Sequence, residues 1–527
     1  MRRASTGGRR RQAWLAALRA GLAATATLGC PAARATPWDY LPVGDPLAAE
    51  LRLLDTTDPG AQGRIRLPHL GTLPLQWREL EGREAPAESV GPARAIAFAR
   101  LERALGRQRP PTFAPHPIYR STPWLWRGES EEQIVELSAG IEGRVEGDRF
   151  AGRAVSGSGG RVGVSLAFER WLVHGDALLG RVDDARRFAD PLIANSDVLV
   201  HTENAFVAYS GDRWGVRFGR SRWHWGPGEE GSLLLSKTSP ALTALAARVR
   251  IEPLRADLIT LAGTLDRAAG EQLAAHRLEW QPHARLRVGL AEGARYHAAS
   301  WAPLYAVGLI PYTMVQRLEA QDDPDSSGAV RNNVLVSADL AWRPVSGTRV
   351  YAELLVDDLH ARTTKNPNKL GGQLGWEGVG EIAHTRVSWG GEYTRLARFV
   401  YSSSFGRAWA TQGQPLGFPT GPDAGRLRLR GGWDPDPDWQ LAARVTHTEQ
   451  GEGDLRHPFT GGPPPDPFRF TGVVERTREA ELGLRWWPAS GVDLAAWGGY
   501  RWVENDAHRP GVSSRTPTAA LELKISR

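Results

Sequence analysis

The chain has 527 residues, with 65 lysines and arginines against 59 aspartates and glutamates, a formal net charge of +6 and a pI near 9.6. Hydrophobic residues make up 41% of it and charged residues 24%, which excludes a disordered chain and a helical membrane bundle. The positive excess lies in residues 1–35, which hold seven arginines and no carboxylate. Without them 58 basic residues face 59 acidic ones, so bulk charge predicts no nucleic-acid partner.

Residues 1–35 have the parts of an export signal. A basic stretch ends at Arg11, an apolar stretch runs from Ala13 to Leu28, and Ala33-Arg34-Ala35 offers a small-residue cleavage site. We expect this segment to be a cleaved signal peptide. Cys30 raises lipid modification as an alternative, although Leu28 stands two residues before it instead of three. Because Cys30 is the one cysteine in the sequence, the mature chain has no disulfide or thiolate metal site.

Residues 36–112 are predicted to form a small α-helical periplasmic element. Leu47–Leu54 follows Asp45-Pro46, which suits a helix with proline in its first turn. Ala93–Leu105 places its apolar side chains near one face, and glycine follows it. A proline-rich linker comes next, so we place a domain boundary near residue 113.

Beyond residue 113 the apolar period changes from 3.6 to 2. Apolar side chains alternate with charged residues or glycine over segments of about 10 residues, as strands of a transmembrane barrel do. Examples are Val135–Val145, Val162–Phe168, Val334–Trp342 and Leu482–Trp486. A soluble sandwich or propeller alternates in the same way, so the pattern alone leaves both classes open.

The longest uncharged run of the sequence is Ala298–Gln316. Pro303 and Pro311 interrupt it, and a helix that spans a bilayer needs about 20 mostly apolar residues without such breaks. The sequence therefore predicts no transmembrane helix after the leader.

A weak repeat favours the membrane barrel. Four tryptophans are each followed two residues later by proline: Trp280, Trp342, Trp433 and Trp486. Proline marks the end of a strand, and tryptophan prefers the edge of the hydrocarbon layer. At about 23 residues per strand and connection, residues 113–527 hold about 18 strands. We therefore predict an all-β fold, a transmembrane antiparallel β-barrel of the cell outer membrane, with the helical element at its N-terminal side.

The segment Gly219–Ser236, which contains Trp223-His224-Trp225-Gly226-Pro227-Gly228, resembles the Wzi-type capsule assembly proteins of Gram-negative outer membranes. Shorter segments resemble the same family in the same order: His276–Trp280, Tyr351–Asp358, Gly391–Arg395 and Gln414–Gly417. The resemblance implies a monomeric 18-stranded outer-membrane barrel, similar to a surface lectin that helps attach or organise capsular polysaccharide. It implies neither catalysis nor a cofactor.

Within the first of these segments, Trp223, His224, Trp225, Glu229 and Glu230 are the predicted polysaccharide-binding residues. Aromatic faces stack on sugar rings, and carboxylates accept hydrogen bonds from hydroxyl groups. The alternative is a strand end whose interfacial tryptophans precede a Gly-Pro-Gly turn.

A second group of charged residues is predicted to line the lumen: Glu353, Asp357, Asp358, Arg426, Arg428 and Arg430. The arginines alternate on one strand and are suited to bind acidic sugars or carboxylates, although a GC-rich genome would also favour arginine. Along a strand Glu353 and Asp357 lie roughly 13 Å apart, too far for the carboxylate pair of a glycosidase. We recognise no metal or cofactor motif, so we expect no catalytic residue, no metal and no cofactor.

These patterns predict an outer-membrane capsule assembly protein that binds capsular or exopolysaccharide and helps attach or organise it without catalysis. The expected partners are that polysaccharide, outer-membrane lipid and the barrel assembly machinery, and the expected state is a monomer. Two alternatives remain at this stage. One is a porin-like channel with an arginine-lined lumen, and the other is a barrel hydrolase.

Overall fold

The computed structural model describes residues 47–57, 72–73, 94–97, 99–100, 126–129, 133–148, 153–168, 170–182, 198–211, 213–322, 332–359, 366–404, 406–489 and 492–526. The predicted signal peptide and the proline-rich linker lie outside these residues. Helix α2 (Leu47–Thr57) forms where the sequence predicts a helix, and residues 94–97 and 99–100 are also helical. No helix in the described ranges is long and apolar enough to cross a membrane.

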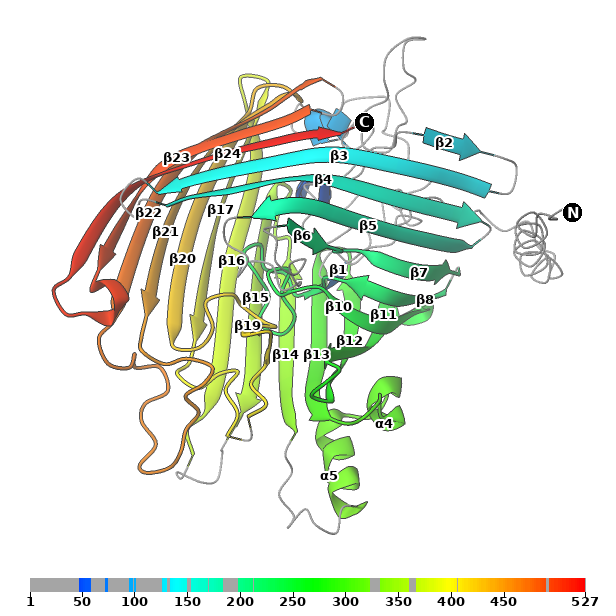
Figure 1. Cartoon of the computed structure of the whole chain (residues 1–527), viewed down its shortest axis with the longest axis vertical. Coiled ribbons are helices and arrows are strands. Elements are labelled where there is room, and N and C mark those ends of the chain that lie inside the picture. Colours follow the sequence, from blue (N-terminus) through cyan, green and yellow to red (C-terminus); the bar gives the residue numbers. More distant parts are fainter. Residues whose placement is uncertain are drawn as a thin grey trace, which may run out of the picture. The chain divides into compact units, whose positions relative to one another are not determined.

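Eighteen of the described strands form one closed antiparallel ring, in which the last strand pairs with the first (Figure 1). In ring order they are β3 (Gln133–Asp148), β4 (Arg153–Phe168), β5 (Trp171–Val182), β7 (Ala205–Ser210), β8 (Trp214–Ser221), β10 (Leu242–Ile251), β11 (Ala256–Asp266), β12 (Glu271–His283), β13 (Leu286–His297), β14 (Asn333–Trp342), β15 (Thr348–Asp358), β16 (Lys369–Ile382), β17 (Thr385–Leu396), β20 (Ala424–Asp434), β21 (Trp439–Gln450), β22 (Glu475–Ala489), β23 (Val492–Glu504) and β24 (Ser513–Ser526). The predicted antiparallel barrel is confirmed.

Shorter elements accompany the ring. β2 (Trp126–Glu129) pairs with β3, and β6 (Val198–His201) pairs with β5. Strand β1 (Thr72–Leu73) precedes the ring in the chain. The others lie in connections: β9 (His224–Trp225), β18 (Ala410–Thr411), β19 (Gln414–Pro415), the helices α4 (Pro303–Val307) and α5 (Tyr312–Asp322), and the short 3-10 turns η3 (Glu252–Leu254) and η4 (Asp506–His508).

The connections differ in length between the two ends of the ring. Residues 383–384 join β16 to β17 at one end, whereas residues 397–423 and 451–474 form connections at the other end. Outer-membrane barrels have short periplasmic turns and longer extracellular loops. We therefore call the end with the long connections the outer end, and the opposite end the periplasmic end.

The polarity of the wall is the reverse of that of a soluble barrel. On neighbouring strands Leu278 pairs with Leu290, and both side chains are exposed on the outside. Arg277 and Glu279, on either side of Leu278, are buried in the interior. Since successive residues of a strand point to opposite faces, the outside is apolar and the lumen is polar, as in a barrel that faces lipid.

Tryptophans mark the periplasmic end of the wall. Trp280, Trp342 and Trp433 are each close to half exposed, at 45%, 48% and 45%. Trp486 stacks on Trp439 with ring centroids 4.9 Å apart. This position is that of an interfacial aromatic girdle, which a soluble sandwich does not require.

Replacing Leu290 with arginine tests the outward polarity. A charge on the lipid face near the bilayer midplane costs about 2–4 kcal/mol, so we expect the Leu290→Arg variant to lose that much unfolding free energy in lipid vesicles. Denaturant titration gives the value. The control is Thr460→Arg in the exposed connection 451–474, where we expect a change within about 0.5 kcal/mol. Equal losses in the two variants would contradict a lipid-facing Leu290.

Candidate functional site

The connection between β8 and β10, residues 222–241, folds into the barrel, and we call it the plug segment. Its strand β9 pairs with β1, and Trp225 also bridges to Leu235. Its polar groups bond to β15, β16, β17 and β20, which lie across the ring from β8 and β10. A segment that joins opposite walls of a closed ring runs through the interior, so the plug segment fills part of the lumen.

The Gly-Pro-Gly sequence lets the plug segment lie directly against the wall. A Cβ atom on Gly226 would stand 2.6 Å from Oε2 of Glu353, and one on Gly228 would stand 2.2 Å from Oε1 of Gln373. Gly226 also has a φ of +152°, which residues with side chains rarely adopt. Glycine is therefore required at both positions by the close approach.

Glu392 on β17 receives the tip of the plug segment. The backbone N–H groups of Glu229 and Glu230 donate to its carboxylate over 2.7 and 3.3 Å. The Tyr351 hydroxyl and the Gln373 amide donate to the same carboxylate over 2.7 and 3.0 Å. One buried carboxylate thus accepts hydrogen bonds from two backbone donors and two wall side chains, and such charge-assisted bonds are among the stronger ones.

Glu353 on β15 holds the next part of the plug segment. It accepts hydrogen bonds from the backbone N–H of Leu233 at 3.0 Å and from the hydroxyls of Ser232 and Ser337 at 3.1 and 3.0 Å. Only 2% of Glu353 is exposed. Removing this carboxylate would leave a buried backbone donor without its partner.

The side chains of Glu229 and Glu230 face basic residues of the lumen. Glu230 forms ion pairs with Arg428 and, at 3.6 Å, with Arg426. Glu229 pairs with Arg52 of α2 and lies 3.9 Å from Arg430. The structure therefore brings the two predicted polysaccharide-binding carboxylates together with all three predicted lumen arginines, and within the described residues they bond to each other.

Trp223, His224 and Trp225 are buried, with exposures of 5%, 2% and 0%. The two tryptophans belong to an apolar cluster that the plug segment forms with the connection 397–423. The ring of Trp409 from that connection donates to the Leu234 carbonyl over 2.8 Å. In this structure the two indoles pack inside the protein, so their assignment to sugar binding stays a prediction.

His224 uses both ring nitrogens, and this arrangement requires a neutral ring. Its Nε2–H donates to the Gly228 carbonyl at 3.1 Å, while Nδ1 accepts the backbone N–H of Lys237 at 3.3 Å. Burial lowers the pKa of His224 well below its ordinary value, and the positive charges of Lys237 and Arg52 lower it further.

The other two predicted carboxylates lie near the outer end of β15. Asp357 is buried and accepts the backbone N–H of Tyr401 at 2.7 Å. Asp358 is more exposed and pairs with Lys369 at 2.7 Å. Asp357 thus fixes the connection 397–423 above the plug segment, and Asp358 contacts the neighbouring strand.

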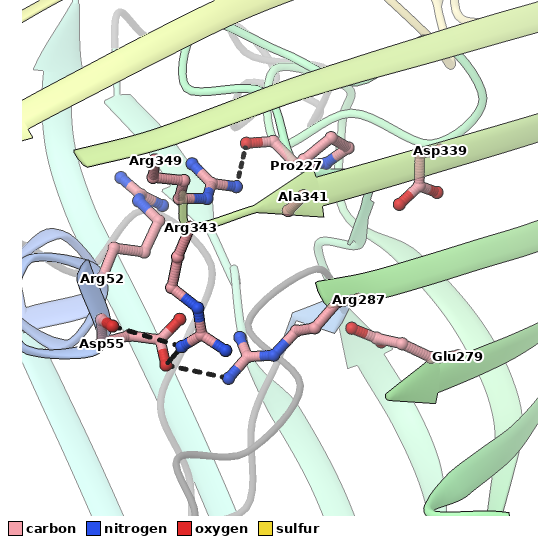
Figure 2. Close-up of a pocket in the computed structure, with 9 residues that line it drawn as sticks. All are labelled: Arg52, Asp55, Pro227, Glu279, Arg287, Asp339, Ala341, Arg343 and Arg349. Atoms are coloured by element: carbon pink, nitrogen blue, oxygen red, sulfur yellow. Dashed lines mark hydrogen bonds and ion pairs between the residues drawn. The ribbon is translucent and has the colours of Figure 1, made fainter. Parts of the chain in front are cut away.

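Helix α2 faces the plug segment from the periplasmic end, and a small cavity lies between them (Figure 2). Asp55 of α2 bonds to Arg287 at 3.0 Å and to Arg343. Across the cavity Arg349 donates to the Pro227 carbonyl at 2.9 Å. The remaining lining residues are Arg52, Glu279, Asp339 and Ala341. The cavity is therefore lined by ion pairs that join α2 to the wall.

Glu50 of α2 makes a second contact with the wall. It pairs with Arg386 and Arg100, at 2.5 and 2.6 Å, and both arginines also pair with Asp434. Burial opposes the ionisation of Glu50, but the two guanidinium groups outweigh it and lower its pKa to about 2. Glu50 therefore stays charged in its binding position across the physiological pH range.

Aromatic rings and arginines gather at the outer end. Arg395 lies over the ring of Phe470 at 3.8 Å, and Phe399 contacts Phe459 edge to face at 5.6 Å. Phe468 is 48% exposed. No sequence motif marks these residues as a site. The available signal was three phenylalanines within residues 459–470, in a polar and proline-rich connection.

Asp423 joins the two long connections at the outer end. Its carboxylate accepts the backbone N–H groups of Gly453 at 3.1 Å and Thr471 at 3.0 Å. It is fully buried. The connection 451–474 is thereby tied to the connection 397–423, which itself packs on the plug segment. Among the residues that the structure describes, no group of three or more His, Cys, Asp or Glu side chains could hold a metal ion.

An apolar exterior, a polar lumen and an internal segment define this protein as an outer-membrane β-barrel with a folded plug. Residues 120–295 match the family model of the capsule assembly protein Wzi. The match includes the motif of the plug segment and confirms the family resemblance. Among curated proteins, no sequence matches the chain.

A solved structure shares the fold. The chain is 16% identical to Wzi of Escherichia coli, described as a carbohydrate-binding β-barrel and outer-membrane protein involved in group 1 capsule assembly; the TM-score is 0.62, over 92% of this chain and 99% of that one. OpdK of Pseudomonas aeruginosa has 14% identity and a TM-score of 0.44, over 76% and 100% of the two chains. OprD of the same organism has 9% identity and a TM-score of 0.42, over 75% and 95%.

Acid is expected to destabilise the fold through His224. Below its ordinary pKa of about 6.5 an unfolded chain takes up a proton that the buried ring cannot, so stability falls by up to about 1.4 kcal/mol per pH unit. Unfolding free energies at about pH 7.5 and about pH 5.5 measure the loss. In the His224→Gln variant, which keeps a donor and an acceptor without titrating, the loss should be smaller. An identical pH dependence in both proteins would contradict a neutral, buried His224.

The plug segment should block ion flow, and its two carboxylate anchors should be required for this. In planar bilayers we expect the natural protein to show no steady open-channel current. The Glu353→Ala/Glu392→Ala variant should show opening events, because the backbone N–H groups of Glu229, Glu230 and Leu233 lose the carboxylates that accept their hydrogen bonds. Glu504→Ala, which removes an exposed carboxylate away from the plug segment, is the control. A steady current through the natural protein would contradict the account.

Proposed function

We propose that this chain binds capsular or exopolysaccharide at the cell surface and helps attach or organise it, without catalysis. The observation that carries the proposal is the plug segment, an extracellular connection that is folded into the lumen and bonded to the opposite wall. A lumen occupied in this way favours a binding surface at the outer end over a passage for solutes. The family match and the description of E. coli Wzi as carbohydrate-binding support the same role.

The outer end offers chemistry suited to an acidic glycan. Phe468 presents an exposed ring, and aromatic faces stack on the apolar faces of sugars. Arg456 of the same connection is largely exposed, and a guanidinium group binds a carboxylate through two parallel hydrogen bonds. Because Asp423 ties the connections 397–423 and 451–474 together, this surface is held in place before any ligand binds. Little ordering entropy would then be lost on binding.

A porin-like channel is the second reading of an arginine-rich lumen. Arg426, Arg428 and Arg430 do face the interior, but their ion pairs are with Glu229, Glu230 and Glu377. Arginines that hold an internal segment are not available to pass anions. We therefore favour the binding role, and the conductance measurement above separates the two.

One pair of residues bears on catalysis. The Ser165 hydroxyl lies 2.8 Å from Nδ1 of His174, on the paired strands β4 and β5. A hydrolase also needs an oriented base and donors for the oxyanion, and we assign no such role to groups near this pair. Product formation from a panel of glycans and phospholipids would contradict the non-catalytic proposal.

The remaining features of the proposal concern export and assembly. We propose that residues 1–35 are removed on export, that residues 36–112 form a periplasmic element, and that residues 113–527 form the barrel. The barrel assembly machinery would insert the chain, with outer-membrane lipid around its apolar exterior, and the chain would act as a monomer. The export-signal pattern, the periplasmic-end position of α2 and the apolar exterior support these points.

Phe468→Ala tests the outer-end surface. We expect the variant to bind the purified capsular polysaccharide of the source strain more weakly, by roughly threefold to tenfold, since one aromatic contact contributes about 0.5–1.5 kcal/mol. Titration calorimetry measures the affinity. Val512→Ala, another exposed apolar residue of an outer connection, is the matched control and should bind normally.

Deletion of the gene tests the wider role. Cell-attached polysaccharide should fall and released polysaccharide should rise by a similar amount. Unchanged attachment would remove the main proposal, even if the purified protein binds sugar.

A further inference from the structure

The connection between β13 and β14 contains α4 and α5, and we call residues 298–322 the outer hairpin (Figure 1). The ring of Trp301 donates to the Thr264 hydroxyl of β11 at 3.1 Å. The backbone N–H of Tyr312 donates to Glu292 of β13 at 2.7 Å. The outer hairpin is thus folded against the wall. Whether it lies inside or outside the barrel follows from the face of the sheet on which Thr264 and Glu292 stand.

Strand register places the contacted residues on the outside of the barrel. Leu278 pairs with Leu290, and both are exposed on the outer face. Two residues nearer the outer end, His276 pairs with Glu292 and also with Thr260 of β11. Residues two apart on a strand share a face, and directly paired residues share it too. His276, Glu292 and Thr260 therefore point away from the lumen.

A polar group at this position would be costly if it faced lipid. Ionisable residues on the lipid face destabilise a barrel, most strongly near the midplane. Yet only 6% of Glu292 is exposed. The outer hairpin covers it: Tyr312 and Thr313, at the start of α5, donate their backbone N–H groups to the carboxylate over 2.7 and 3.1 Å, and Nε2 of His276 lies 3.4 Å away.

The inner face of the outer hairpin fits this polar patch closely. Tyr305 stacks on Tyr296 of β13 with centroids 4.3 Å apart, and Tyr312 lies 4.5 Å from His276. Both tyrosines of the hairpin are fully buried. A Cβ on Gly308 would stand 2.9 Å from Thr260, so the turn between α4 and α5 lies directly on β11. These contacts fix the hairpin on the wall.

The opposite face of the outer hairpin is apolar and uncovered. It carries six exposed side chains, with exposures from 36% to 68%: Leu304, Val307, Leu309, Ile310, Met314 and Leu318. The uncharged run Ala298–Gln316 noted in the sequence spans most of the hairpin. Exposed apolar side chains gathered on one connection in this way indicate an interaction surface.

The surroundings of this face identify what covers it. Glu292 lies five residues from the outer end of β13, which corresponds to roughly 13 Å along the barrel axis for a tilted strand. That depth falls within the apolar band, which is about 25 Å tall. The exposed ring of Phe218 on β8 meets the ring of Trp301 edge to face, with ring centroids 6.3 Å apart. The apolar face of the hairpin therefore continues the lipid-facing surface of the wall.

We propose that the outer hairpin is embedded in the outer leaflet, where its exposed apolar side chains contact lipid acyl chains while its inner face seals the polar patch around Glu292. It works as an external cover that lets an ionisable pair occupy the outer wall. The proposal rests on the outer-membrane location and is independent of polysaccharide binding.

Site-specific fluorescence in vesicles tests this proposal. In the full chain with Cys30→Ser, the Met314→Cys variant is labelled with an environment-sensitive fluorophore and reconstituted into phosphatidylcholine vesicles that carry a spin label on the acyl chain. Leu309→Cys provides a second position on the same face. Leu290→Cys on the bare wall is the lipid-exposed control, and Thr460→Cys in the connection 451–474 is the water-exposed control.

We expect the hairpin labels to be quenched nearly as strongly as the label at position 290 and severalfold more strongly than the label at position 460. Quenching at the level of position 460 at both hairpin positions overturns the proposal. Shielding from both the lipid-borne quencher and aqueous iodide would mark contact with a second copy of the chain, and overturns it as well. Circular dichroism confirms the β-sheet content of each variant, so a misfolded protein is not read as an outcome.

Discussion

The structure depends on two carboxylates that the barrel wall presents to its own interior. Glu353 and Glu392 stand on β15 and β17, are almost completely buried, and accept backbone N–H groups of the plug segment. A buried charge is tolerable only when donors surround it, and backbone amides inside a lumen need acceptors in the same way. The backbone N–H groups thus satisfy the carboxylates and the carboxylates satisfy the N–H groups, which lowers the free-energy cost of burying both. The result is an extracellular connection held inside the barrel, and this leaves the outer end as the surface that can meet a polymer.

Charge pairing extends this principle to both faces of the wall. Inside, Glu50 and Asp55 of α2 bind wall arginines from the periplasmic end. Outside, the single ionisable pair considered above, His276 and Glu292, is covered by the outer hairpin rather than by lipid. A residue that would be unfavourable in an isolated strand is thus accommodated by a connection that folds back over it. In each case a connection or helix supplies the partners that the strands lack.

Much of the fold could be predicted from the sequence, because a strand with one apolar and one polar face alternates with period 2 and each Trp-x-Pro marks a strand end. The site could not be predicted in the same way. Glu353, Glu392 and Arg428 come from three strands, and no local pattern shows that residues 222–241 turn inward to meet them. The sequence around Trp223 and Trp225 does not show whether these side chains face sugar, lipid or an apolar cluster. Period 2 likewise identifies the face of Glu292 only after Leu290 is known to point outward.

Amide hydrogen exchange of the plug segment tests the central claim most directly. If the segment is held in the lumen by the two carboxylates, the amides of Glu229, Glu230 and Leu233 should exchange as slowly as those of the wall strands, because their N–H groups are bonded and removed from water. Amides of the exposed residues 460–462 should exchange fast in the same sample. Exchange of Glu229, Glu230 and Leu233 at the rate of residues 460–462 would contradict the account.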